Sequence, residues 1–348
     1  MIKYYDNAPA GTEQGTMKGF DAEFSNIVDY ILRITHRIWE GKQIGLCRDY
    51  YSEDCPIYTL AGYTEGAEQV TQNTICTLSA FPDRTLHADN IIWGGNDEEG
   101  YHTSHLICSN MTNLGPSEFG PATGRKAQIQ VIAHCVVKDN RIIEEWLVRD
   151  NYQLALQLGA DPLAYAQQKA DLPFQPELAQ WLSSEFDRVH AQERTPSNYH
   201  DQIAGDHEAF IKAALNNIWN ARLLGDCHLL YADNARLHAS ARDDYDGIGA
   251  VTRFYIEILG ALPDARISLD YSCHNSMLEG DYVAVRWTLA GTHSGASLWG
   301  APSGAPVLVL GESHYRLSAG KVVEEWLVFD ELAVMTQIER ARRQVAWE

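Results

Sequence analysis

Apolar residues recur at helical spacing in two stretches that lie far apart in the chain. Side chains three and four positions apart fall on one face of an α-helix, so each stretch is predicted to be an amphipathic helix that packs on a hydrophobic core. The first stripe consists of Phe24, Ile27, Val28, Ile31, Ile34 and Ile38, and the second of Ile211, Ala214, Leu215, Ile218 and Trp219.

Each of these helices is followed by the same order of elements. A second helical pattern covers residues 70–81 and returns at 248–259, and each copy stops near a proline. Helices followed by an antiparallel meander of strands indicate the α+β class. In the first copy the runs that read as strands are residues 85–93, 101–110, 126–138 and 141–150.

The last two of these runs are expected to form a hairpin, because only Asp139 and Asn140 separate Lys138 from Arg141. A two-residue turn pairs His134 with Glu145, on the face opposite Asp150. One extra residue would reverse this parity and turn the histidine toward the aspartate. His134, and His314 in the second copy, are interpreted first as structural histidines and otherwise as pocket residues.

The last strand also reveals an internal repeat. The sequence EEWLVRD at 144–150 returns as EEWLVFD at 324–330, a shift of 180 residues in a chain of 348. The same shift carries Trp39 onto Trp219. A repeat spacing of this size indicates duplicated domains, because solenoid units are much shorter. The expected parts are an N-terminal extension (1–23), a first domain (24–160), a partly helical linker (161–204) and a second domain (205–348).

The linker and the sheet faces indicate how the copies are arranged. After Pro176 the apolar residues keep helical spacing, which predicts a proline-started helix, with a hinge near 194–198.

Both faces of the final strand are partly apolar. A sheet of this kind usually meets a second sheet, so we expect an internal pseudo-dimer, with a homodimer of the chain left open.

Composition and charge narrow the range of partners. The net charge of −20 would repel phosphate backbones and anionic lipids, so neither nucleic acid nor a membrane is expected as a partner. No run of 18 apolar residues and no leader-like start is present, which favours a cytoplasmic location. The seven cysteines lack a CxxC spacing and are expected to be free thiols.

Asp150 and Asp330 are the leading catalytic candidates. Each ends a strand on the same face as a tryptophan, Trp146 or Trp326, so each carboxylate is expected at the rim of an apolar pocket, where desolvation raises its pKa. Such a group can take a proton from a carbon beside a carbonyl and return it to an oxygen. The alternative is that each aspartate simply caps the helix that follows it.

Other side chains are weaker candidates for a binding role. Arg286 could hold a carboxylate or enolate oxygen, or could form an ordinary ion pair. His293 lies near it, where a strand enters a Gly/Pro loop. Phe119 and Trp299 could cover a pocket mouth or only pack a loop. His102 and His105 face opposite sides of a strand, so no metal site is expected, and no nucleotide-binding or nucleophile motif indicates a cofactor.

Three sequence features resemble the SnoaL-like polyketide cyclases of the NTF2-like superfamily. They are GTHSG at 291–295, a PxxGR-like PATGR at 121–125, and the strand ending in EW with an aspartate four residues after the tryptophan. The resemblance covers residues 24–160 and 206–345. It implies two α+β cones, each a curved antiparallel sheet wrapped around helices that encloses a deep pocket.

The resemblance also implies a chemistry. In that family an aspartate at this strand end acts as general acid/base in a cofactor-free intramolecular aldol ring closure, which points to Asp150 and Asp330. The second copy keeps the pattern better, because Asp150 is followed by Asn151-Tyr152 and the first copy has MTNLG in place of GTHxG. The second half is therefore expected to be the better candidate for activity.

The sequence supports two functional hypotheses. The first is a cyclase or isomerase that performs cofactor-free acid/base chemistry beside the carbonyl of a small apolar compound. The second is a non-enzymatic ligand-binding or scaffold protein in which the aspartates are helix caps. Whether the chain is an enzyme is left open, and a buried aspartate in an open pocket would favour the first hypothesis.

Overall fold

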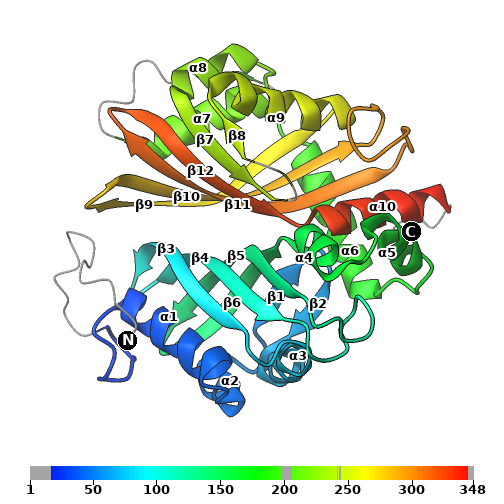
Figure 1. Cartoon of the computed structure of the whole chain (residues 1–348). Helices are drawn as coiled ribbons and strands as arrows, with labels where there is room; N and C mark the ends of the chain where they lie inside the picture. The colour runs from blue at the N-terminus through cyan, green and yellow to red at the C-terminus, as the bar shows by residue number, and fades with distance from the viewer. Residues whose placement is uncertain (1–16, 194, 198–205, 241, 243, 344–348) are drawn as a thin grey trace.

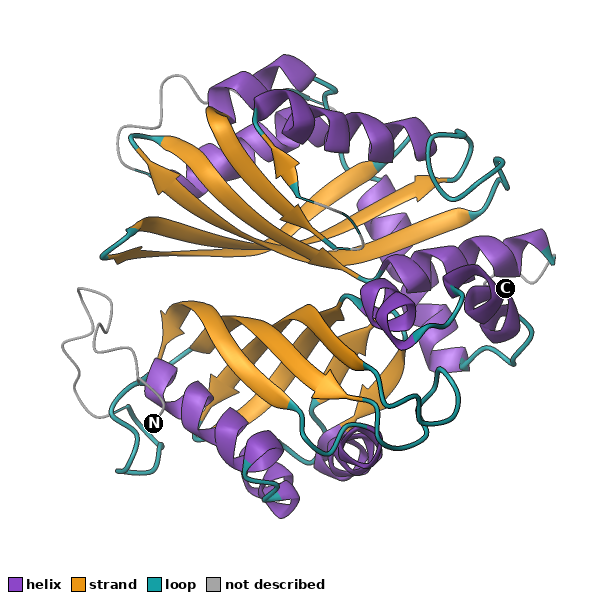
Figure 2. Cartoon of the chain, viewed as in Figure 1, coloured by secondary structure: helices purple, strands orange, loops and turns teal. Residues whose placement is uncertain are grey.

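Two six-stranded sheets lie face to face, and the long helices of each half cover the outer face of its own sheet (Figures 1 and 2). This arrangement comes from a computed structural model that describes residues 17–193, 195–197, 206–240, 242 and 244–343. Most of the expected N-terminal extension and both ends of the expected hinge, residues 194 and 198, lie outside the described residues. None of the described helices is long and apolar enough to span a membrane.

The first half begins with helix α1, whose N-cap residue Asn26 accepts a hydrogen bond from the backbone of Asp29. Its sheet has the order β2-β1-β6-β5-β4-β3. The helices are α1 (Ile27–Thr35), α2 (Cys47–Tyr50) and α3 (Gly66–Ala80), and the strands are β1 (Pro56–Thr59), β2 (Gly62–Glu65), β3 (Thr85–Asn96), β4 (Gly100–Thr112), β5 (Lys126–Lys138) and β6 (Arg141–Arg149).

The second half repeats this plan, with the sheet order β8-β7-β12-β11-β10-β9. Three helices connect the halves: α4 (Asn151–Leu158), α5 (Pro162–Ala170) and α6 (Pro176–His190). The second half comprises α7 (His207–Trp219), α8 (Cys227–Leu230), α9 (Ile248–Ala261) and α10 (Glu331–Arg342), with β7 (Tyr231–Ala239), β8 (Tyr245–Asp246), β9 (Arg266–Met277), β10 (Gly280–Thr292), β11 (Pro306–Ser318) and β12 (Lys321–Phe329).

The α+β class and the antiparallel meander β3 to β6 are as the sequence predicts. The sheets are nevertheless mixed, because the short strand β1 pairs in parallel with β6, and β7 pairs in parallel with β12. These strands were not predicted: β1 has only four residues, and the alternation of Ala235, Leu237 and Ala239 with polar residues in β7 was overlooked. All seven cysteines are free.

A β-bulge in each final hairpin reverses the expected register. The turn has two residues, Asp139 and Asn140, both with positive φ, as a type I′ turn requires. The pairing then shifts between Val136 and Val137, which leaves one extra residue in β6. His134 therefore pairs with Trp146, not with Glu145, and shares its face. The pairing of His134 expected from the sequence is thus wrong, and His314 likewise pairs with Trp326.

The register decides which side chains enter each cone. Glu145 is buried inside the first half, where its carboxylate accepts a hydrogen bond from the hydroxyl of Tyr51 at 2.9 Å. Trp146 and Val148 point the other way, into a hydrophobic cluster between the halves. That cluster also contains Leu106 and Ile132 of the first sheet, Leu182 of α6, and Leu308, Leu310 and Val328 of the second sheet.

The interiors of the two cones differ. Large aromatic side chains fill the second cone, whereas smaller or charged ones occupy the same repeat positions in the first. The pairs, first half then second, are Thr74 and Tyr255, Ile107 and Trp287, Cys135 and Tyr315, and Arg149 and Phe329, and all four aromatic members are buried. The large ring of Trp287 fits because the neighbouring residue is Gly311. A Cβ atom at position 311 would lie 2.2 Å from that ring, too close for a packed interior.

Replacing Gly311 by valine, the residue at the repeat-equivalent position 131, should therefore destabilise the protein by about 1–3 kcal/mol through overpacking. In a Trp287→Ile background the ring is gone, and the same valine should be tolerated. Urea denaturation of both single variants and the double variant measures this coupling. A valine penalty of equal size in the two backgrounds would contradict the role of Trp287 as the filler of the second cone.

Candidate functional site

The first cone contains an open cavity that divides into adjoining chambers. A deep chamber of about 60 Å³ lies between α1 and the sheet. A main chamber of about 430 Å³ and a side chamber of about 300 Å³ lie nearer the surface. An outer pocket of about 290 Å³ follows, beside α5, α6 and α10. The chambers share lining residues, among them Arg84 and Arg149 in the first three and Asn151 in all but the deep chamber.

The deep part of this cavity carries charged and polar groups. Burial raises the pKa of Glu145, which lines both the deep and the main chamber. Burial lowers the pKa of His105 to about 3, so this imidazole is neutral, and its buried Nε2 has no hydrogen-bond partner among the described residues. The chamber thus offers a carboxyl group, a neutral imidazole and two arginines within apolar walls.

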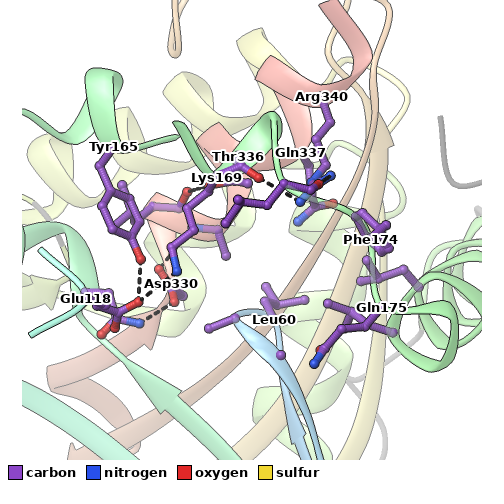
Figure 3. A pocket seen from close by; sticks show the side chains of 18 of the residues that line it. Leu60, Glu118, Tyr165, Lys169, Phe174, Gln175, Asp330, Thr336, Gln337 and Arg340 are labelled. Carbon is purple, nitrogen blue, oxygen red and sulfur yellow. Dashed lines mark hydrogen bonds and ion pairs between the residues drawn. The ribbon is translucent and has the colours of Figure 1, made fainter. Parts of the chain in front are cut away.

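Asp330 belongs to the second half but forms part of the wall of the first-half cavity. Its side chain lines the main chamber and the outer pocket (Figure 3). One oxygen caps helix α10 through the backbone of Ala333, and the other accepts from Asn151 Nδ2 at 2.5 Å. Burial is the main cause that raises the pKa of Asp330 to about 7. A carboxyl group with this pKa exists in both protonation states at neutral pH.

Asp150 takes a different position from its repeat partner. It is buried and caps helix α4, where its side chain accepts a hydrogen bond from the backbone of Gln153 at 3.0 Å. It does not line the chambers or the outer pocket described above. Both aspartates therefore cap the helix that follows them. Of the two, Asp330 also lines the cavity, whereas Asp150 does not.

The outer pocket is bordered by Glu118 and Phe119 of the loop before β5 and by residues of α5, α6 and α10. The Tyr165 hydroxyl donates a hydrogen bond to Glu118, and Lys169 lies 3.5 Å from the same carboxylate (Figure 3). Phe119 packs against Tyr165 with ring centroids 4.9 Å apart and lines the outer pocket and the side chamber. Phe119 thus both packs a loop and lines the cavity, and its role as a cover of the pocket mouth stays a prediction.

His134, His314, Trp146 and Trp326 lie between the sheets. His134 Nδ1 is 2.9 Å from Glu312, and Ser104 bonds both Glu312 and His314. Burial by itself would raise the pKa of the Glu312 carboxyl. The nearby His134 and the hydrogen bond from Ser104 have a larger combined effect, so this pKa is lowered. Burial lowers the pKa of His314 to about 4. Together these residues form a buried polar interface cluster.

The expectation that the two tryptophans line the cone pockets is wrong, because the bulge places them on the interface face. Trp146 stacks on Tyr58, and the guanidinium of Arg286 lies 3.3 Å above its ring. Trp326 stacks on His238 and borders a separate cavity of about 350 Å³ between the sheets. Arg286 therefore contacts an aromatic face rather than the first-half cavity.

His293 and Trp299 brace the loop after β10. The two ring nitrogens of His293 contact Ser303 at 3.0 Å and the carbonyl of Leu298 at 3.1 Å. The indole N–H of Trp299 donates to Glu331 at 2.8 Å. Neither side chain lines the chambers of the first half.

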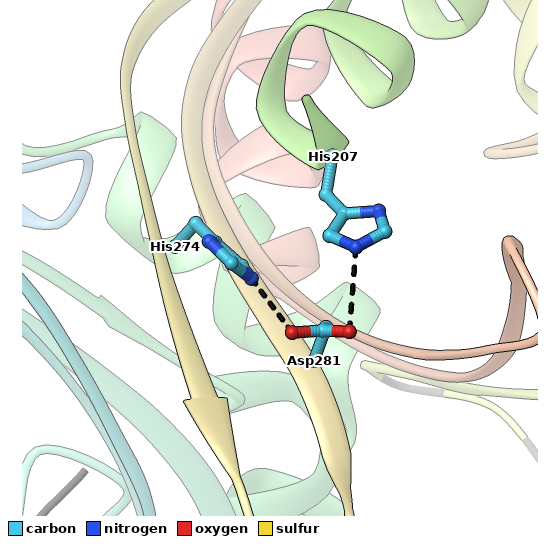
Figure 4. A group of neighbouring side chains, drawn as sticks. All are labelled: His207, His274 and Asp281. Atoms are coloured by element: carbon cyan, nitrogen blue, oxygen red, sulfur yellow. Dashed lines mark hydrogen bonds and ion pairs between the residues drawn. The ribbon is translucent and has the colours of Figure 1, made fainter. Parts of the chain in front are cut away.

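One group of side chains has the composition of a metal site. His207, His274 and Asp281 converge at the edge of the second sheet, and Asp281 contacts both imidazoles, at 3.3 and 3.0 Å (Figure 4). These separations suit three ligands of a zinc-sized ion. The carboxylate also satisfies both histidines directly, so the group is stable without an ion. It lies apart from the cavity, and its residues are too far apart in the sequence to be predicted as a group.

The sequence reasoning missed the residues that distinguish the first cone. Arg84, His105 and Arg149 correspond to Ala265, Val285 and Phe329 in the second half. The signal was present in the repeat, since EEWLVRD and EEWLVFD differ only at the position of Arg149. Positions where one copy is charged or polar and the other apolar mark the cavity, so this open site lies in the first half, and the second half contributes Asp330 to its wall.

Comparison with protein families accounts for both halves. The sequence model of the SnoaL-like polyketide cyclases matches residues 30–158 and again residues 209–338. The chain therefore belongs to the SnoaL-like polyketide cyclase family and holds two copies of its domain. The comparison with curated proteins gave no match.

Among solved structures, the chain is similar to several single-domain proteins. One is a protein provisionally assigned as a SnoaL-like polyketide cyclase from Jannaschia sp. CCS1, with 22% identity, a TM-score of 0.34, and coverage of 40% of this chain and 97% of that one. Another is IdmH from Streptomyces antibioticus, provisionally assigned as a polyketide cyclase, with 23% identity, a TM-score of 0.33, and coverage of 38% and 98%.

The raised pKa of Asp330 predicts how its replacement alters stability. The folded-state pKa of about 7 exceeds the ordinary value of 3.8, so the folded protein holds this proton more tightly than the unfolded chain. Ionisation then lowers stability progressively between about pH 4 and 7, and the full cost is present above pH 7. Asp330→Asn should remove that pH-dependent cost, on the order of a few kcal/mol. Its amide oxygen keeps the cap, whereas its amide nitrogen cannot accept from Asn151 Nδ2, a loss that is the same at every pH.

Urea denaturation of wild type and Asp330→Asn at pH 5 and pH 8 provides the measurement. The variant should gain stability relative to wild type as the pH rises. A difference between the two proteins that stays constant with pH, or shrinks toward pH 8, would contradict the assignment of a near-neutral pKa to Asp330.

Proposed function

We propose that the protein is a cofactor-free acid/base catalyst, of the cyclase or isomerase type, that acts beside the carbonyl of a small compound bound in the first-half cavity. The single observation that carries the proposal is Asp330, a buried carboxyl group with a pKa of about 7 in the wall of an open chamber. General acid/base groups work best when their pKa lies near the operating pH. Membership of the SnoaL-like family supports the same class of reaction.

In the proposed reaction, ionised Asp330 removes a proton from a carbon beside the carbonyl. The electron pair of the broken C–H bond passes to the carbonyl, which becomes an enolate. The protonated Asp330 then returns its proton to a second carbon, for isomerisation, or to the oxygen formed when the enolate attacks another carbonyl, for aldol closure. No step involves oxidation.

Glu145 is a second carboxyl group in the same chamber, but its setting has a structural explanation. The pair Glu145–Tyr51 recurs in the second half as Glu325–Tyr231, with a hydroxyl–carboxylate distance of 2.5 Å inside the filled cone. The pair is present even in the second cone, where large aromatic side chains leave little room for a ligand. We therefore assign it a role in stabilising the fold. Asp330 is therefore the preferred proton-transfer group.

A ligand-binding protein without catalysis is the second candidate, and one observation favours it: both aspartates cap helices. Catalysis and binding are separated by following hydrogen–deuterium exchange at carbons beside the carbonyl. Proton NMR in D₂O, with a panel of 1,3-dicarbonyl compounds and aryl ketones, detects proton transfer even when no product accumulates.

The wild-type protein should accelerate exchange in at least one compound, and Asp330→Asn should slow it by about 10²- to 10⁴-fold. Asp150→Asn is the matched control, because it alters the equivalent cap outside the cavity, and should change the rate only a few-fold. Equal rates for wild type and Asp330→Asn, or no exchange above buffer with any member of the panel, would sink the catalytic proposal and leave the binding function.

A further inference from the structure

Two arginines face the same cavity, and neither forms a close ion pair with a described carboxylate, although the charge of Arg149 acts on Glu145 from a distance. Arg84 precedes β3, Arg149 ends β6, and both line the deep, main and side chambers. Arg84 donates through Nε to the hydroxyl of Ser109 at 2.8 Å, and the buried Nε of Arg149 has no hydrogen-bond partner among the described residues. In the part of the chain that the structure describes, no carboxylate lies within 4.0 Å of either guanidinium.

This arrangement is costly for the empty protein. Buried cations are normally paired, because the loss of hydration must be offset by an opposite charge. Burial and the neighbouring charge of Arg149 lower the pKa of Arg84 to about 9. The fold does not require the pair, since the second half has Ala265 and Phe329 at these positions and folds in the same way.

We propose that Arg84 and Arg149 together bind a carboxylate group of the ligand, so that the protein acts on a small organic acid with an apolar body. The planar fork of a guanidinium matches the two oxygens of a carboxylate. Ile31, Ile34 and Ile107 of the deep chamber and Leu147 supply the apolar surface for the body. This inference rests on the proposed use of the first-half cavity, but not on proton transfer by Asp330.

A monoanion fits better than a phosphate. Three carboxyl groups, Glu118, Glu145 and Asp330, line the same main chamber and would repel a dianion. The formal net charge of −20 also disfavours highly charged anions. The two arginines can neutralise a single carboxylate while the remainder of the ligand extends toward Asp330.

Binding is tested with benzoate, phenylacetate and acetoacetate, each paired with its neutral amide, by isothermal titration calorimetry and thermal shift. Sodium chloride at equal ionic strength controls for salt effects. At least one acid should raise the melting temperature and bind more tightly than its amide by about 10- to 100-fold, the range expected for charge-assisted hydrogen bonds. Acids and amides that bind equally, or acids that do not bind at all, would overturn the proposal.

Variants locate the site. Arg84→Met and Arg149→Met should each reduce the preference for acid over amide to a few-fold, and Arg149→Lys should retain part of it. Arg253→Met, which removes an exposed arginine paired with Glu257, is the charge-matched control and should bind like wild type. Unchanged acid binding in both methionine variants would place the anion elsewhere and refute the assignment.

Stability separates a binding role from a structural one. If the arginines serve the ligand, Arg149→Met should keep or raise the melting temperature of the free protein while it loses acid binding. A large fall in melting temperature, with the acid preference intact in Arg149→Lys and Arg84→Met, would identify a structural role instead. Asp330→Asn should still bind the acid, so failure of catalysis and failure of anion binding are distinguishable.

Discussion

The one-residue bulge in each final hairpin is the constraint on which the site depends. Side chains alternate between the two faces of a strand, so one extra residue exchanges the occupants of the faces. With the bulge, Glu145 and Arg149 point into the first cone, whereas Trp146 and His134 point toward the other sheet. Without it, the polar interface cluster and the charged cavity would exchange their side chains, and neither could form.

The two halves show how a duplicated domain can divide its tasks. The second cone is filled by Tyr255, Trp287, Tyr315 and Phe329, so its interior serves packing. The first cone keeps open space and charged groups without close ion pairs, both of which reduce stability and suit a binding site. The interface joins these tasks, because it fixes β12 and α10 so that Asp330 reaches the chamber of the other half.

Much of the fold could be predicted from the sequence, because it depends on local patterns. The periodicity of residues 24–38 and 248–259, the prolines after the helices and the exact recurrence of EEWLV identify the main helices, the last strand and the duplication. The site could be predicted only in part. A bulge leaves no mark in hairpin periodicity, so Trp146 and His134 were assigned to the wrong surroundings. The position of Asp330 beside Asn151 depends on long-range packing, which a single sequence does not contain. Asp330 was visible in the sequence as a strand-end aspartate, and the difference between Arg149 and Phe329 was visible in the repeat.

The covalent link between the halves has an evolutionary consequence. In a symmetric pair of identical chains every substitution occurs twice, so a change that benefits one pocket is imposed on the other. In a fused chain the two halves have separate sequences, so a substitution in one half leaves the other unchanged. Glu312 meets His134 and Ser104 across the interface, while the residue at the equivalent position of the first half is Ile132. The fused chain therefore buries one carboxylate, which contacts groups on the opposite sheet. A symmetric dimer would bury the same carboxylate twice and would need partners for both copies.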